Sequence, residues 1–124
     1  LKINVRTLMM VDSTEMTHED RTVVANNCVH ADEDRIVITH GTDTMTDTAE
    51  VIAQRNQEKT IVLTGAMTPY TFGSSDGLFN LGSAVAFAQS MPHGVYVAMN
   101  GLCFDWDNVK KNKKTGFFED LGKK

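Results

Sequence analysis

The sequence predicts an α/β fold with a mostly parallel sheet and helices on both faces, a three-layer arrangement of the Rossmann-like or flavodoxin-like kind. Two short apolar runs, Arg35–Thr39 and Thr60–Thr64, have the composition of buried parallel strands. Segments with helical periodicity follow both runs, and such alternation is typical of a parallel sheet. A chain of 124 residues is the size of one domain, so we expect a single domain over residues 1–124.

The first part of the chain is expected to form a strand and then a helix. Residues 2–10 alternate between apolar and more polar side chains, which predicts a half-buried strand. A helix should begin within residues 13–20, where Thr17 and Asp20 have the spacing of a capping box. Acidic residues 32–34 should end it. Val24 and Cys28 would share its inner face, with Val23 beside them.

Two more helices and one more strand complete the predicted order. The helix after the first buried strand would pack through Ala49, Ile52 and Ala53. A loop over residues 66–75 contains Pro69 and Gly73 and leads to a helix over about residues 76–90. Four apolar residues lie at helical spacing in that helix: Leu78, Leu81, Val85 and Ala88. Residues 95–99 are predicted to form the last strand.

Polar clusters follow the predicted strands. They lie at residues 12–14, 39–44 and 64–68 and at Asn100. In open α/β sheets, ligands bind outside the carboxyl ends of the strands. We therefore expect these clusters to meet at one edge of the sheet and to form the binding site.

Composition excludes several function classes. The net charge is −4, and six of the twelve basic residues lie near the end, where a solvated and frayed terminus is expected from about residue 112. We predict no nucleic-acid partner, and no apolar run approaches the ~20 residues of a membrane-spanning helix. Cys28 and Cys103 are far apart and the histidines lack ligand spacing, which predicts no metal, no cofactor and reduced thiols in a cytoplasmic protein.

The segment of residues 40–45, His-Gly-Thr-Asp-Thr-Met, is the most specific motif. Gly41 permits a tight turn, and Thr42 and Asp43 then lie near a helix N-terminus, where unpaired N–H groups favour anions such as a substrate carboxylate. An amine with a lowered pKa beside Thr42, held by Asp43, could activate the hydroxyl. Alternatively, Thr42, Asp43 or Thr44 merely caps the helix, and caps are the commoner use of such residues.

The same segment resembles a signature of the L-asparaginase and glutaminase family. Three further segments resemble family motifs in the same order, at residues 12–16, 63–67 and 75–81. The similarity extends over about a hundred residues and implies the catalytic α/β domain of that family. It also implies hydrolysis of the side-chain amide of L-asparagine, or of a related amino-acid amide, to an acid and ammonia.

The resemblance implies roles for individual residues. Thr42, Asp43 and Lys111 would form a Thr–Lys–Asp catalytic triad, although Lys110 is only one position away. Ser13 would bind the α-carboxylate of the substrate, Asp43 its α-amino group, and the carbonyl of Ala66 its side-chain amide. The substrate-binding set comprises Ser13, Thr14, Gly41 and Ala66.

The sequence departs from the family pattern in several places. The usual nucleophile loop, T-G-G-T-I, does not occur, so we expect the N-terminal strand and its loop to lie upstream of Leu1. We also expect no smaller C-terminal domain, as in a short asparaginase-like class that the chain resembles. Thr14 stands where the family usually has glutamine and Thr68 where many members have arginine, which leaves the amide substrate open.

Four alternatives remain open from the sequence. The nucleophile lies in the upstream loop, or Thr42 itself attacks with Lys111 as its base. The chain could instead be a non-catalytic amino-acid-binding module, or an amidotransferase-type glutaminase subunit. In each case we expect a homo-oligomer, either a dimer or a tetramer, because a sheet this small would expose apolar area.

Overall fold

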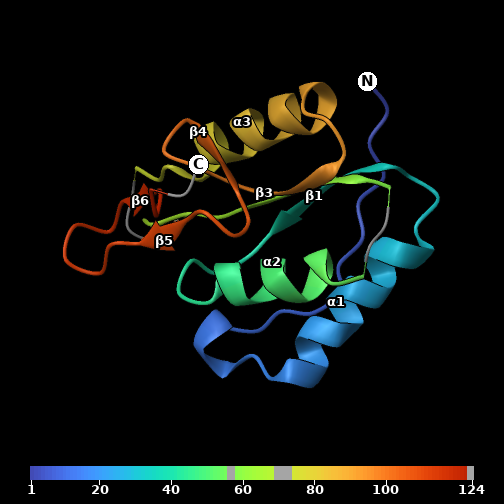
Figure 1. Ribbon diagram of the computed structural model, residues 1–124, viewed down its shortest axis with the longest axis horizontal. Coiled ribbons are helices and arrows are strands. Elements are labelled where there is room, and N and C mark those ends of the chain that lie inside the picture. Colours follow the sequence, from blue (N-terminus) through green and yellow to red (C-terminus); the bar gives the residue numbers. More distant parts are fainter. Residues whose placement is uncertain (56–57, 69–73, 123–124) are drawn as a thin grey trace.

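The computed structural model describes residues 1–55, 58–68 and 74–122, and it confirms the α/β class. A four-stranded sheet has the order β1-β2-β3-β4, with α1 and α2 on one face and α3 on the other (Figure 1). The strands are β1 (Arg35–Thr39), β2 (Thr60–Thr64), β3 (Gly94–Met99) and β4 (Leu102–Asp105). The helices are α1 (His18–His30), α2 (Met45–Ala53) and α3 (Gly77–Ser90), preceded by a short 3-10 turn, η1 (Ser13–Glu15).

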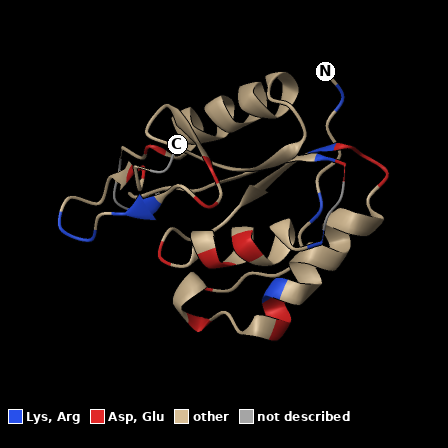
Figure 2. Cartoon of the chain, viewed as in Figure 1, with Lys and Arg blue, Asp and Glu red and all other residues tan. Residues whose placement is uncertain are grey.

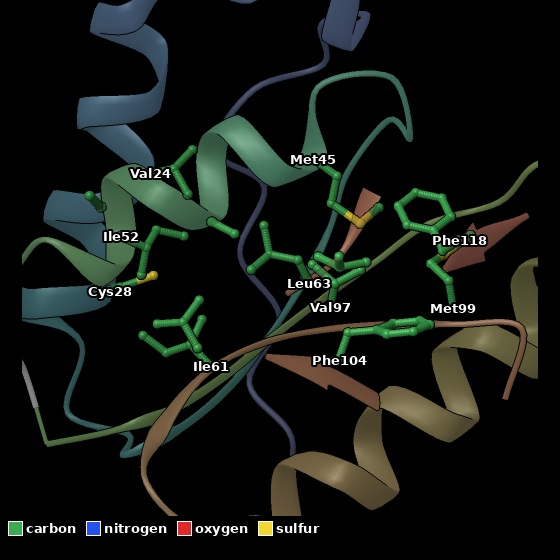
Figure 3. Packing of buried hydrophobic residues seen from close by; sticks show 14 residues of the cluster. Val24, Cys28, Met45, Ile52, Ile61, Leu63, Val97, Met99, Phe104 and Phe118 are labelled. Atoms are coloured by element: carbon green, nitrogen blue, oxygen red, sulfur yellow. The ribbon is translucent and has the colours of Figure 1, made fainter. Parts of the chain in front are cut away.

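The first three strands are parallel, and the core lies on both faces of the sheet. Ile36 is opposite Ile61 in the β1–β2 ladder, and Leu63 is opposite Val97 in the β2–β3 ladder. Side chains alternate between faces along a strand. Those on one face pack against α1 and α2 in the larger cluster (Figure 3), and those on the other pack against α3. Figure 3 labels the central members of the larger cluster, among them Met45, Ile52, Ile61, Leu63 and Val97.

The two crossover connections have opposite hands. The chain moves one strand along the sheet from β1 to β2 through α2, and one further in the same direction from β2 to β3 through α3. Because α2 and α3 lie on opposite faces, one connection must be of the rare left-handed kind. Both helices nevertheless start at the carboxyl ends of strands, so the loops that precede them share one edge of the sheet.

The first helix forms largely as predicted, whereas the strand expected before it does not form. Thr17 and Asp20 make the expected reciprocal capping box, and Val24 and Cys28 are buried. Val23, expected beside these two residues, is 44% exposed. Residues 2–10 belong to no strand: among their apolar side chains only Met9 packs against the core. Alternation alone is insufficient, because a strand also needs a hydrogen-bonded neighbour.

Two further predictions of burial are corrected. The strand β1 is parallel but only partly buried, because it forms an edge of the sheet. In α3 the buried residues are Asn80, Ala84 and Ala88, so Ala88 is buried as predicted. The prediction was wrong for Leu78 and Leu81, which are 70% and 38% exposed, and Val85 is half-buried. The small alanine side chains allow α3 to lie close to the sheet. In α2, Ala49 and Ile52 are buried as expected, and Ala53 is partly buried.

The described C-terminal part contains three short strands beyond the last predicted one. An Asn100-Gly101 turn, with positive φ at both residues, leads into the antiparallel strand β4, which the sequence analysis missed. A second, two-stranded sheet pairs β5 (Lys110–Lys111) with β6 (Phe118–Glu119), and Phe118 is buried. Pro69 and Gly73 of the predicted loop lie outside the described residues, as do two of the six basic residues near the end, Lys123 and Lys124.

Charge is distributed unevenly over this fold. Figure 2 shows acidic residues on α1 and α2 and basic residues on the hairpin of β5 and β6. In the described ranges, no helix is long and apolar enough to cross a membrane. Within the same ranges, no group of three or more His, Cys, Asp or Glu residues is placed to hold a metal ion.

Candidate active site

The loop after β1 is held tightly against η1. A methyl group added at Gly41 would lie 2.7 Å from both Cβ and Oγ of Ser13, so the two segments can touch only because residue 41 has no side chain. Thr44 Oγ1 donates a hydrogen bond to the Ser13 carbonyl over 2.9 Å, and Ser13 is buried. The sequence prediction that residues 12–14 and 39–44 meet at one edge of the sheet is thereby confirmed.

The predicted triad residues lie together. Lys111 Nζ donates hydrogen bonds to Thr42 Oγ1 at 2.9 Å and to Asp43 Oδ1 at 2.7 Å. The Lys111 side chain is 15% exposed and that of Asp43 47% exposed. The hydrogen bond and the charge of Lys111 lower the pKa of Asp43 below its ordinary value, with a smaller contribution from Lys113. Lys110 instead points to Glu119, 3.6 Å away, so Lys111 is the lysine that reaches Thr42.

His40 braces the loop that carries Thr42. Its Nδ1 lies 2.7 Å from the Gly41 carbonyl, which can only accept, so Nδ1 carries the proton. The neutral ring then accepts at Nε2 from the Thr48 hydroxyl, 2.7 Å away on α2. Burial lowers the pKa of His40 and favours this neutral form. No role for His40 follows from the sequence, because nothing in its spacing from Thr48 signals the contact.

The loop after β2 lies beside the same site. A Cβ atom at Gly65 would overlap the carbonyl oxygen of His40, so the loops after β1 and β2 are in direct contact. Ala66 follows and is half-buried. The carboxylate of Asp76 accepts hydrogen bonds from the backbone N–H groups of Met67 and Thr68, at 3.1 and 3.0 Å.

The predicted binding residues are not equally well placed. Ser13 contacts Gly41 directly, and Ala66 adjoins the Gly65 contact with His40. Thr14 is exposed, and its hydroxyl and backbone N–H both bond to Asp12 Oδ1 at 3.1 Å. An open hollow of about 450 Å³ lies along the hairpin beside Lys111. It is lined by Lys110, Lys111, Asn112, Lys113, Lys114 and Glu119.

A family model described as "Asparaginase, N-terminal" matches residues 1–118. The chain belongs to the asparaginase family. The resemblance inferred from four sequence segments is therefore confirmed.

Individual relatives agree with this membership. The chain is 42% identical over 101 residues to an L-asparaginase of Thermococcus kodakarensis, covering 78% of the chain and 31% of that relative. It is 44% identical over 86 residues to L-asparaginase 2 of Escherichia coli (66% and 25% covered). It is 47% identical over 94 residues to a glutaminase-asparaginase of Pseudomonas aeruginosa (71% and 26%). The matched region thus spans a third or less of these curated relatives.

A solved structure confirms the fold of this asparaginase-family chain. The thermostable L-asparaginase from Thermococcus kodakarensis superposes with a TM-score of 0.90 at 33% identity. The superposition covers 99% of this chain and 39% of the solved one. The order of strands and helices described above is therefore the fold of the family in this region.

Proposed function

We propose that the chain supplies the amide-hydrolysing site of an amidohydrolase that splits L-asparagine, or a related amino-acid amide, into the acid and ammonia. The observation that carries the proposal is the position of Lys111 Nζ, within hydrogen-bonding distance of both the Thr42 hydroxyl and the Asp43 carboxylate. Relatives named L-asparaginase and glutaminase-asparaginase support the substrate class.

The arrangement suits proton removal from a hydroxyl. As a neutral amine, Lys111 would accept the proton of Thr42, and Asp43 would keep the amine in place through its hydrogen bond. An oxygen nucleophile activated in this way would attack the amide carbon and form a tetrahedral intermediate. Ammonia would leave with a proton returned by Lys111, and water would then hydrolyse the acyl-enzyme. Thr42 would act either as this nucleophile or as the hydroxyl that passes the proton from it.

Substrate binding is proposed for the residues around the triad. Asp43 is partly exposed and negatively charged, which suits the α-amino group of an amino acid. Ser13 at the start of η1 and the backbone of Gly41 would take the α-carboxylate. The Ala66 carbonyl would accept from the side-chain amide, and Thr14 would lie at the rim.

The decisive experiment measures ammonia release from L-asparagine by the full-length protein and three variants. We expect Thr42→Ala and Lys111→Ala to lower kcat/KM by roughly 10²–10⁴-fold, the range of general acid–base contributions. Lys110→Ala is the matched control, because Lys110 belongs to the same short strand but pairs with Glu119 at the surface. It should stay within about threefold of wild type.

Other outcomes have definite meanings. Wild-type turnover in both Thr42→Ala and Lys111→Ala would reject the assigned site. Calorimetric binding of L-asparagine without ammonia release from the wild type would favour the non-catalytic binding module instead.

A homo-oligomer acting in the cytoplasm also belongs to this proposal. The exposed Leu78 and Phe79 on α3 support association, and the free thiols of Cys28 and Cys103 suit a reducing compartment. Light scattering of the purified protein and fractionation of the source cells would test the two statements. One relative is named a probable periplasmic L-asparaginase, so a periplasmic location is the specific competitor.

A further inference from the structure

A buried asparagine joins the loop after β2 to the turn after β3. Asn80 on α3 is 1% exposed, and its Nδ2 donates to the Gly65 carbonyl at 2.8 Å and to Asp76 Oδ2 at 3.0 Å. Its Oδ1 accepts from the backbone N–H of Asn100 at 3.3 Å. A single side-chain amide therefore holds the ends of two neighbouring strands.

A second asparagine extends this connection to the hairpin that carries Lys111. Asn100 has a φ of 58° in the tight turn before β4, and its Oδ1 accepts the backbone N–H of Phe118 at 3.1 Å. Phe118 is the Cα partner of Lys111 in the β5–β6 ladder. The side chain of Phe118 is buried in the core, so its N–H requires an acceptor inside the protein.

The hairpin is too short to be stable without contacts to the rest of the fold. Its two strands have two residues each, and an isolated hairpin of this size is not stable in water. The buried Phe118 side chain attaches β6 to the hydrophobic core. The hydrogen bond from the Phe118 N–H to Asn100 Oδ1 attaches β6 to the turn after β3. The hairpin turn also touches the loop after β2, because a methyl group at Gly116 would lie 3.0 Å from Met67 Cε.

We propose that Asn100 and Asn80 are positioning residues of the active site. Their amides form a relay from Gly65 to Phe118 that sets Lys111 against Thr42 and Asp43. The relay also holds the peptide next to Ala66, so the base and the proposed amide-binding carbonyl keep a fixed separation. This inference rests on the function proposed above.

The substitution Asn100→Gly tests the relay. Glycine adopts a positive φ without strain, so the turn and the N–H that bonds to Asn80 remain while the acceptor for Phe118 is lost. Displacement of a reacting group by about 1 Å can cost 10²-fold in rate, so we expect kcat for ammonia release to fall at least ~10-fold, with KM changing less than ~3-fold.

The pH profile gives a second readout that a merely structural role would not move. When Lys111 withdraws, Asp43 loses the contact that lowers its pKa. In Asn100→Gly the pH profile of the Asp43 carboxyl, followed by NMR, should therefore shift to higher pH. Asn100→Asp retains the acceptor oxygen and should restore kcat to within about threefold of wild type.

Gly101→Ala is the control for a damaged turn. It strains a residue with a φ of 78° but leaves the relay amides in place, so it should lower thermal stability without moving the pH profile. Equal kcat and identical pH profiles in folded Asn100→Gly and wild type would overturn the inference. Were Asn100→Gly to yield no folded protein, a tenfold or greater loss of kcat in folded Asn100→Asp would overturn it instead.

The two proposals fail in different ways. If Thr42→Ala and Lys111→Ala retain activity, the proposed function is wrong. If those two variants are inactive while Asn100→Gly has the kcat and pH profile of wild type, only the positioning inference is wrong.

Discussion

The two halves of the Thr42–Asp43–Lys111 cluster are held in different ways. Thr42 and Asp43 lie in a loop that continues a strand of the main sheet, and its backbone is in direct contact with η1 and with the loop after β2. Lys111 lies on a strand of two residues outside that sheet. Its reach depends on the buried ring of Phe118 and on the Asn100 amide.

We therefore expect the loop of Thr42 and Asp43 to keep its position until the whole domain unfolds. The hairpin of Lys111 can be displaced while the rest of the domain stays folded. Local opening requires less free energy where few buried contacts must be broken. We therefore expect substitutions near Thr42 to act mainly on global stability. Substitutions in the hairpin should alter activity under conditions in which the main sheet remains folded.

The largest effect is expected for Gly65→Ala. The added Cβ would overlap the His40 carbonyl oxygen, and neither strand end can move away without disturbing the β1–β2 ladder. The free energy of unfolding should fall by more than about 4 kcal/mol, a size that single substitutions seldom reach.

Gly82→Ala is the control for Gly65→Ala. A methyl group there meets nothing within 4 Å, and alanine should stabilise α3 by about 0.5–1 kcal/mol. Urea denaturation of both variants checks this, and equal stabilities would contradict the described contact.

The second largest effect is expected for Phe118→Ala, which removes the aromatic anchor of the hairpin. Truncation of a buried phenylalanine costs about 3–5 kcal/mol, and the low end applies here because the hairpin can move into the space. Activity should fall before the main sheet unfolds, because Lys111 is opposite Phe118. The neighbouring Phe117 is 61% exposed, so Phe117→Ala should change stability by no more than about 0.5 kcal/mol. If Phe118→Ala keeps its activity up to the urea concentration at which the main sheet unfolds, the position of Lys111 does not depend on the Phe118 side chain.

The same two regions differ in how far the sequence predicts them. Strands β1 and β2 and the α1 capping box follow from apolar runs and a four-residue motif, and the structure places them as predicted. The hairpin was missed, because two-residue strands have no periodicity and Phe118 finds its neighbours only through the tertiary fold. The Asn100-Gly101 pair was the one local signal for β4, since this dipeptide favours the tight turn between antiparallel strands.

Orientation was harder to predict than the elements themselves. The apolar stripe of α3 suggested that Leu78 and Leu81 face the sheet, yet Asn80 and Ala84 do. Asn80 is buried because its amide binds Gly65, and a partner of this kind cannot be found from helical spacing. The grouping of Thr42, Asp43 and Lys111 was predicted from family resemblance, since composition alone favours capping. The bracing of the loop by His40 was not predicted at all.

A smaller effect is expected for Gly41→Ala. The new Cβ would lie 2.7 Å from Ser13 Cβ and Oγ and 3.2 Å from the Ser13 backbone nitrogen. The Oγ atom can rotate away, whereas Cβ and the nitrogen move only with the backbone of the short η1 turn. We expect a loss of about 1–2 kcal/mol in the free energy of unfolding, together with a raised KM because the proposed carboxylate site is squeezed. In a Ser13→Gly background only the 3.2 Å contact with the backbone nitrogen remains, so the same substitution should cost at least about 0.5 kcal/mol less. Thermal denaturation of the wild type, the two single variants and the double variant completes the cycle. An equal cost in both backgrounds would rule out the contact as the cause.

The smallest effect is expected from the protonation of His40, which links the loop of Thr42 to α2. Burial holds its pKa below the ordinary value of 6.5, so above pH 6.5 the ring is neutral in both the folded and the unfolded protein. As the pH falls through 6.5, the unfolded chain binds the proton first, and the free energy of unfolding falls until the folded pKa is reached. This slope is at most about 1.4 kcal/mol per pH unit for one group.

The carboxyl groups of Asp43 and Asp76 have pKa values below 3.8, so they change the free energy of unfolding only at lower pH. Urea titrations between about pH 7.5 and 5.5 should show the slope in the wild type and in His18→Gln, an exposed control, but not in His40→Gln. The same slope in His40→Gln would mean that the pH dependence comes from another group and that His40 is not held neutral by the loop.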